Sequence, residues 1–228
     1  MTSEEPAPSA QVGLEAFAAL AAHQLGEAIA LMRGAGAVLA AQQGALGPGG
    51  QDALRALSAG GDRAQRYVDD LLDVVRAGSD PPSEPVATDL DPAFDAAAAE
   101  LDVALSRIPV DVQREPLPRA AIEAGDARRL FAHLLRSALA AGATRLGVTG
   151  RVTGGDAVVE VYDNGTPAGD LGQAFVPFAG PRGRGPLVGA GVSLPVCRRL
   201  AERAGGRIAM DVRADGATIV TVQLPVAR

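Results

Sequence analysis

Apolar residues recur at alternating steps of three and four in the first third of the chain, in two segments separated by a turn sequence at residues 47–50. The first segment, residues 12–43, contains no proline and carries the stripe Leu25, Ile29, Met32, Gly36 and Leu39. The second, residues 51–76, carries the stripe Leu54, Leu57, Gly61, Ala64, Val68, Leu71 and Val75. This spacing is typical of bundle helices and predicts a helical hairpin. A single hairpin cannot bury both stripes, so we expect a homodimer in which two hairpins form a four-helix bundle.

The helical pattern ends at residues 79–85, where Ser, Asp, Glu and Pro cluster in a predicted linker. Beyond it we expect helices at 91–105, 127–141 and 192–204, and strands at 107–114, 120–123, 145–151, 157–162, 207–212 and 217–224. Helices mixed with mostly antiparallel strands predict an α/β sandwich. The expected fold class is therefore α+β. We expect the chain to consist of a disordered leader (1–11), the hairpin (12–78), the linker (79–85) and a second domain (86–228).

Composition narrows the possible functions. The net charge is −6, aromatic residues make up 3% and Trp is absent, which argues against a nucleic-acid partner. All 21 basic residues are Arg, which excludes lysine chemistry. The single cysteine, Cys197, allows no internal disulfide and fits a reducing compartment. Polar residues interrupt the apolar stretch 17–39, and the N-terminus does not resemble a secretion signal, so we expect no membrane span and a cytoplasmic location.

His23 is the first candidate for chemistry. It lies about 200° around the helix from the apolar stripe and should face solvent. Glu27 follows four residues later on the same face, where its carboxylate can hydrogen-bond an imidazole nitrogen and fix the tautomer of the ring. The pair is typical of a phosphoryl acceptor, although spacing alone also fits a surface histidine on an amphipathic helix.

Two further features suggest nucleotide binding. Asp163, at the end of a predicted strand, begins the sequence Asp-Asn-Gly; it is either a turn residue or a carboxylate that accepts a hydrogen bond from the amine of adenine. Glycines then precede the helix at 192–204, where free backbone N–H groups favour phosphate. Arg182 and Arg184 lie in this glycine-rich segment and could reach a phosphate tail, although linkers look the same.

The order of these features resembles the transmitter module of bacterial sensor histidine kinases, over about residues 15–226. Residues 22–29 (AHQLGEAI) resemble the H box, and residues 63–72 (RAQRYVDDLL) are similar to the second helix of phytochrome-type kinases. Residues 163–165 resemble the G1 box, 175–178 the F box and 189–194 the G2 box of a GHKL-type ATP-binding domain. The helix from Leu130 takes the place of the N box.

The resemblance implies a role for each matching residue. His23 would be the phosphoacceptor, flanked by Gln24 and Glu27, and Asp163 would hold adenine. ATP and Mg²⁺ are the implied cofactors. The remaining implied nucleotide-binding residues are Ser137, Gly165, Arg182, Arg184, Gly189 and Gly191.

The sequence also departs from the family pattern. His133 and Ser137 stand where the N box normally has Asn; a hydroxyl is a weaker Mg²⁺ ligand than an Asn carbonyl, and imidazole suits this cation poorly. Gln24 replaces the usual acid after the phosphoacceptor. Further substitutions are Ala28 for proline in the H box, Pro167 for a G1 glycine and Ser193 for a G2 glycine. Both Glu123 and Asp126 stand near an Asp of the family, and spacing does not choose between them.

The resemblance implies autophosphorylation of His23 by ATP and transfer to an Asp of a response regulator receiver domain, with input from a separate sensor protein. The alternative is a histidine phosphotransferase or pseudokinase scaffold with an eroded ATP site. A non-kinase ATPase of the same superfamily fits less well, because those proteins begin with the ATPase domain.

Overall fold

The computed structural model describes residues 8–79, 86–101, 110–166, 171–177 and 191–226, with side chains of the first helix described from Leu20 onward. The chain divides into two compact units, which we call the N-terminal unit (Met1–Ser79) and the C-terminal unit (Asp80–Arg228). Within the described residues, no helix is both long enough and apolar enough to cross a membrane.

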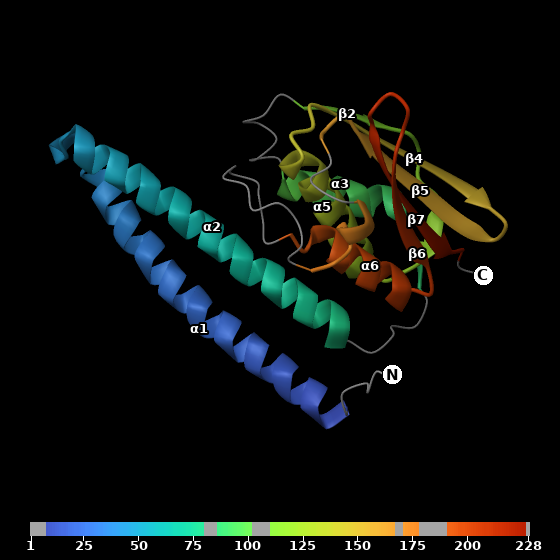
Figure 1. Cartoon of the computed structure of the whole chain (residues 1–228), viewed down its shortest axis with the longest axis horizontal. Helices are drawn as coiled ribbons and strands as arrows, with labels where there is room; N and C mark the ends of the chain where they lie inside the picture. Colours follow the sequence, from blue (N-terminus) through green and yellow to red (C-terminus); the bar gives the residue numbers. More distant parts are fainter. Residues whose placement is uncertain (1–7, 80–85, 102–109, 167–170, 178–190, 227–228) are drawn as a thin grey trace. The chain divides into compact units, whose positions relative to one another are not determined.

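The N-terminal unit is a hairpin of two long helices, α1 (Pro8–Ala41) and α2 (Pro48–Ser79), joined through a short 3₁₀ turn, η1 (Gln43–Ala45) (Figure 1). The predicted hairpin is therefore present. Both helices begin at a proline, which fits the first helical turn because its missing N–H has no partner there. As a result α1 starts inside the segment 1–11 that we expected to be a disordered leader, and α2 starts before Gln51.

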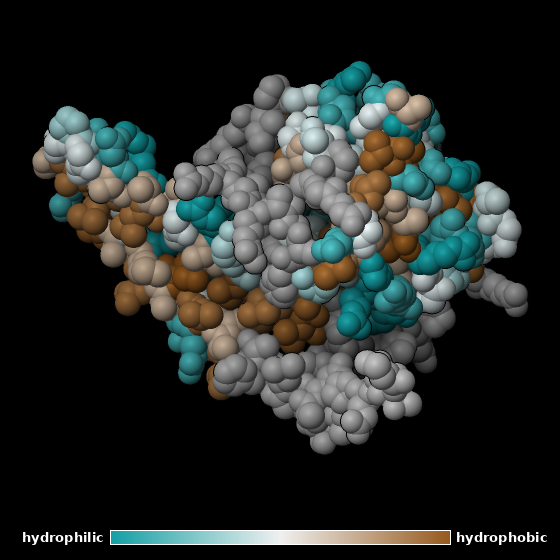
Figure 2. Space-filling model, in the orientation of Figure 1, coloured by the Kyte–Doolittle hydropathy of each residue, from teal (hydrophilic) through white to brown (hydrophobic). Residues whose placement is uncertain are grey.

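The apolar stripes only partly face one another within the hairpin. Ile29 is buried with Ala22 and Val68, and Ala64, Leu71 and Leu72 pack against this cluster. The other large members of the first stripe, Leu25, Met32 and Leu39, remain 44–53% exposed. Figure 2 shows apolar residues gathered along the visible face of the hairpin. One chain alone thus leaves much of the apolar surface that the pattern predicted uncovered.

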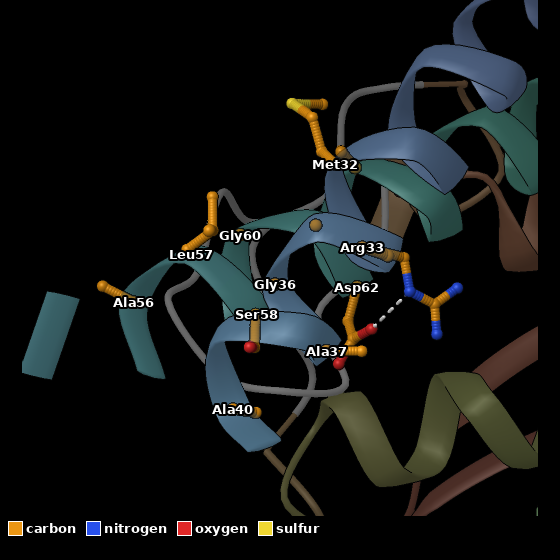
Figure 3. Close-up of a pocket in the computed structure, with 12 residues that line it drawn as sticks. Met32, Arg33, Gly36, Ala37, Ala40, Ala56, Leu57, Ser58, Gly60 and Asp62 are labelled. Atoms are coloured by element: carbon orange, nitrogen blue, oxygen red, sulfur yellow. Dashed lines mark ion pairs between the residues drawn. The ribbon is translucent and has the colours of Figure 1, made fainter. Parts of the chain in front are cut away.

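A groove of about 410 Å³ lies between α1 and α2 in the N-terminal unit (Figure 3). Small residues form much of its lining, including Gly36, Ala37, Ala40, Gly60 and Gly61. Met32 and Leu57 contribute larger apolar side chains, and an ion pair of 3.2 Å joins Arg33 Nε to Asp62 Oδ1 at its edge.

The C-terminal unit is an α/β sandwich, as predicted. A five-stranded sheet has the order β2-β4-β5-β7-β6, in which β2 and β4 are parallel and the other pairs are antiparallel. Helices α3, α5 and α6 cover one face of this sheet (Figure 1). Its strands are β2 (Asp111–Arg114), β4 (Arg145–Thr153), β5 (Asp156–Asp163), β6 (Arg207–Val212) and β7 (Thr218–Pro225).

The helices of this unit are α3 (Leu90–Glu100), α5 (Ala124–Ala140) and α6 (Ser193–Arg203), with a 3₁₀ turn, η2, at Leu171–Gln173. A separate two-stranded sheet pairs β1 (Ala87–Asp89) with β3 (Arg119–Ala121). Strand β1 was not predicted from the sequence, because three residues are too few to show an alternating pattern. Parts of the helix expected at 91–105 and of the strand expected at 107–114 lie outside the described residues.

The core lies between the sheet and its helices. Alternate residues of β5 and β7 point inward, among them Val159, Val161 and Val222. From α5, Phe131 meets Phe94 of α3 edge-on, with ring centroids 5.5 Å apart. Burial raises the pKa of the Cys197 thiol, whose Sγ donates a weak hydrogen bond to the Leu130 carbonyl. This cysteine therefore joins α6 to α5 as a core residue and is not a reactive thiol.

Candidate functional site

His23 projects from α1 into solvent. Its side chain is 73% exposed and that of Glu27 is 71% exposed, and Nε2 of His23 lies 3.5 Å from Oε1 of Glu27. The neighbouring Ala22 is fully buried against α2, so the hairpin packing turns His23 outward. Gln24 is exposed and uncharged. The structure therefore brings His23 and Glu27 together as expected, with an accessible ring that could act as a nucleophile.

Asp163 ends β5 on the inner face of the sheet and is only 6% exposed. Burial raises the pKa of its carboxyl, because the charged form loses solvation, while a hydrogen bond of 2.7 Å from the Gly165 N–H to Oδ1 opposes this shift. Asp163 does not stand in a hairpin turn, since the hairpin joins β4 to β5 at their other ends and β5 pairs next with β7. Its bond from the Gly165 N–H is that of an Asx turn, so the interpretation as a turn residue stands beside that of an adenine contact.

Gly165 is required by close packing. A Cβ at this position would lie 2.8 Å from both the Ala141 Cβ and the Asp163 Oδ1. Thr166 also donates its N–H to the Ala141 carbonyl at 3.0 Å. The absence of a side chain thus allows the chain after β5 to lie directly on the C-terminal end of α5.

The side chain of Asn164 fixes the residues that follow β5 through three hydrogen bonds to Thr144 and Arg145. Its Oδ1 accepts the backbone N–H groups of Thr144 and Arg145 at 2.9 and 2.8 Å, and its Nδ2 donates to the Thr144 hydroxyl at 3.0 Å. These bonds fasten the residues after β5 to the connection between α5 and β4. The middle residue of Asp-Asn-Gly therefore positions its neighbours.

Thr218 is a residue of this site that sequence reasoning missed. It pairs with Asp163 across β5 and β7, so both side chains point to the inner face. Thr218 is 3% exposed, and within the described part of the chain its hydroxyl has no hydrogen-bond partner. A buried polar group in this state is a candidate for a ligand contact. The sequence signal that could have found Thr218 is a polar residue at a position of β7 where the alternation of the strand places apolar, inward-facing residues.

Helix α5 carries the residues that replace the N-box asparagines. His133 is 1% exposed, and Ser137 is partly buried one turn later. The two acidic residues near the beginning of α5, Glu123 and Asp126, differ in burial, while their correspondence to the Asp of the family stays open. Asp126 is buried and accepts hydrogen bonds from Arg203 of α6 and, at 2.7 Å, from Arg129, whereas Glu123 is exposed. Asp126 thus joins the beginning of α5 to the end of α6.

The glycine-rich segment is described only at its edges. Gly191 has a φ of +75°, a conformation that favours glycine, immediately before α6. On the other side, the Arg198 guanidinium of α6 lies 4.7 Å from the centre of the Phe175 ring. Arg182, Arg184 and Gly189, also expected in the site, lie outside the described residues. Within the described residues, no cluster of three His, Cys, Asp or Glu side chains is suited to a metal ion.

Residues 123–228 match the family described as histidine kinase-, DNA gyrase B-, and HSP90-like ATPase. The matched segment lies within the C-terminal unit. It covers β4 to β7 together with α5 and α6, and hence includes Asp163, Thr218 and Gly191. No curated protein sequence matches the chain.

Three solved structures are similar to this chain, and two of them cover most of it, including the N-terminal unit. Full-length ShkA in complex with AMPPNP is 18% identical with a TM-score of 0.70, covering 92% of this chain and 45% of ShkA. The histidine kinase AdeS of Acinetobacter baumannii is 14% identical with a TM-score of 0.59, covering 90% of this chain and 98% of AdeS. The catalytic domain of the histidine kinase ThkA is 18% identical with a TM-score of 0.54, covering 63% of this chain and 97% of that domain.

The chain thus spans less than half of full-length ShkA, and these identities establish similarity of fold. The fold is that of a histidine kinase transmitter, a helical region followed by a GHKL-type ATP-binding domain. The resemblance and the fold class inferred from the sequence are confirmed.

Proposed function

We propose that this protein is a histidine kinase of a two-component system, which phosphorylates His23 with ATP and passes the phosphoryl group to an Asp of a response regulator receiver domain. The observation that carries the proposal is a solvent-facing His23–Glu27 pair on a helical hairpin that belongs to the same chain as a histidine kinase-like ATPase domain. The exposed ring can meet both a nucleotide and a docking protein.

The ATPase domain supplies the proposed nucleotide site. Asp163 would accept a hydrogen bond from the amine of adenine, with the Thr218 hydroxyl beside it. The glycines at 165, 189 and 191 would admit the nucleotide, and Arg182 and Arg184 would reach its phosphates. The similar structure of ShkA was solved with AMPPNP, an adenine nucleotide analogue, which supports this assignment.

Ser137 is the proposed contact to Mg²⁺, since its hydroxyl offers the oxygen ligand that this cation prefers. Bound Mg²⁺ would neutralise charge on the phosphates during transfer. His133 lies buried in the packing of α5, so we assign it no role in holding the metal.

We further propose that the protein acts as a homodimer in the cytoplasm and receives its signal from a separate sensor protein. Exposed Leu25, Met32 and Leu39 on α1, Leu57 on α2 and the groove between the helices form an apolar surface that a second hairpin would cover. Burying such surface stabilises association by about 25 cal/mol per Å² before the costs of binding are subtracted.

A second candidate function is favoured by α5. With His133 and Ser137 in place of the N-box asparagines, the nucleotide site could be eroded, and the protein would then be a histidine phosphotransferase or a pseudokinase scaffold. His23 would still accept phosphate, but from a phosphorylated receiver domain.

Incubation of the full chain with γ-labelled ATP and Mg²⁺ separates the two functions. If the protein is a kinase, the wild type will incorporate acid-labile label and His23→Ala will not. The control His133→Gln will still be labelled, at a level equal to or below that of the wild type. Label that persists in His23→Ala would overturn the assignment of the acceptor. No label from ATP, with label acquired from a phosphorylated receiver domain, would establish the phosphotransferase function.

A further inference from the structure

Arg198 of α6 lies against an aromatic ring, and among the described residues it forms no ion pair with a carboxylate. Its guanidinium carbon lies 4.7 Å from the centre of the Phe175 ring, close enough for a cation to be attracted by the negative face of the ring. Both side chains are half-buried, so water screens this attraction less than at a fully exposed site.

Phe175 belongs to a compact turn at residues 171–177, which begins with η2. Two backbone hydrogen bonds within the turn, of 2.9 and 3.1 Å, hold it together. Its other large apolar side chains, Leu171 and Val176, are 37% and 45% exposed and therefore do not fix the turn in the core. Phe175 is half-buried, and the contact that it makes with α6 is the one with Arg198.

This contact connects two segments that contribute to the proposed nucleotide site. The turn at 171–177 follows Asp163, which ends β5, whereas α6 follows Gly191. Helix α6 is firmly seated, since Cys197, next to Arg198, is fully buried. Arg198 thus joins a turn with exposed apolar side chains to a helix that the core holds in place.

We propose that Arg198 is a positioning residue of the nucleotide site, which holds the turn at 171–177 on α6 through the face of Phe175; the inference rests on the proposed function. Arg198 itself does not contact the nucleotide. Because the turn is already held, less conformational entropy is lost when the nucleotide binds. The cation over the ring favours the held turn about 2–30-fold, and loss of this preference raises the Kd for ATP by up to that factor.

The first test follows the turn itself, without nucleotide. The chain contains no Trp, so Phe175→Trp places a single fluorophore at the ring. In the full chain with this change, Arg198→Gln should make the indole more accessible to acrylamide and shift its emission to longer wavelength. Arg198→Lys retains a cation and should leave the accessibility unchanged.

Arg199→Gln is the matched control, since it removes the same charge from an exposed position of the same helix. The indole should be as well shielded in this variant as in the chain that carries Phe175→Trp alone. Equal accessibility in Arg198→Gln and Arg199→Gln would overturn the proposal.

The second test measures the effect on binding, by calorimetric titration of the full chain with ATP. Arg198→Gln should raise the Kd about 2–30-fold, whereas Arg198→Lys and Arg199→Gln should stay near the wild type. In the Phe175→Ala background, Arg198→Gln should have no further effect, because the two residues act through one contact. A further loss of affinity in that background would show that Arg198 binds the nucleotide directly and would overturn the positioning role.

The two measurements fail separately. If the wild type gives no heat with millimolar ATP, the proposed nucleotide site is wrong, and quenching still decides whether Arg198 holds the turn. If ATP binds but Arg198→Gln changes neither the quenching nor the Kd, Arg198 has no positioning role and the proposed function stands.

Discussion

Replacement of Asp163 by Asn should stabilise the nucleotide-free protein and weaken nucleotide binding. The pKa of Asp163 is raised by burial, so its folded-state pKa lies above the unfolded value. The folded state then binds more protons than the unfolded state between these two pKa values, and stability falls as the pH rises through the folded pKa. Asn is neutral at every pH. The variant should therefore be more stable than the wild type at neutral pH, and the difference should disappear in acid.

The weaker nucleotide binding expected of Asp163→Asn follows from the number of acceptor oxygens on its side chain. Oδ1 of Asp163 accepts the Gly165 N–H at 2.7 Å, and in the proposed complex Oδ2 accepts the adenine amine. Asn has one oxygen, and if that oxygen keeps the bond to Gly165, its NH₂ group meets the amine donor to donor. The loss of a hydrogen bond to a charged group costs about 1.5–3 kcal/mol, which corresponds to roughly 10–150-fold in Kd.

The assays are calorimetric titration with ATP and denaturant unfolding from acidic to neutral pH, both on the full chain. Asp156→Asn is the control, because it changes the same residue type at the opposite end of β5, where Asp156 is partly exposed near Arg207. Unchanged ATP affinity in Asp163→Asn would refute the adenine contact. Lower stability of this variant at neutral pH would refute the account of the buried charge.

Three further substitutions test other parts of the structure. Leu57→Glu should convert a dimer into a monomer in sedimentation, because Leu57 lines the exposed groove of the hairpin; a monomeric wild type would contradict the bundle. Gly147→Ala should lower the free energy of unfolding by about 1–3 kcal/mol, because a Cβ at this position would lie 1.8 Å from Cζ of Tyr162. Adding Tyr162→Ala should recover most of this loss in a denaturant titration. Thr218→Val should keep or raise stability by up to about 1 kcal/mol, because the buried hydroxyl is removed, and should weaken ATP binding; an unchanged Kd would exclude Thr218 from the site.

The fold was largely predictable because periodicity and turn residues agree along the chain. The strand at Arg207–Val212 has the predicted bounds, and α5 and α6 begin and end within a few residues of theirs. The predicted start of the first helix, at residue 12, is later than the observed start at Pro8. The acidic, proline-rich sequence before it carries no apolar stripe that would indicate a helix. The pairing β2–β4 and the strand order depend on contacts between distant residues, which local patterns do not contain.

The candidate site was predictable only in part. Asp163 and His23 stand in recognisable local sequences, whereas Thr218 joins the site through its register with Asp163, and register is set by the whole sheet. Spacing also could not show that Asp126 is buried, because its partner Arg203 lies far along the chain in α6. Exposure of the stripe residues Leu25 and Met32 was implied by the expected dimer.

The bonds of Asn164 to the connection between α5 and β4, and of Thr166 to Ala141 after α5, have a consequence for ligand recognition. They make the carboxyl end of β5 and the last turn of α5 a single stiff corner, closed further by the tight fit of Gly165 on Ala141. A base entering this corner would meet groups already in place, so little ordering entropy opposes its binding. In the proposed complex, differences in affinity among adenine nucleotides should therefore arise from the phosphate end, and the corner should discriminate against other bases.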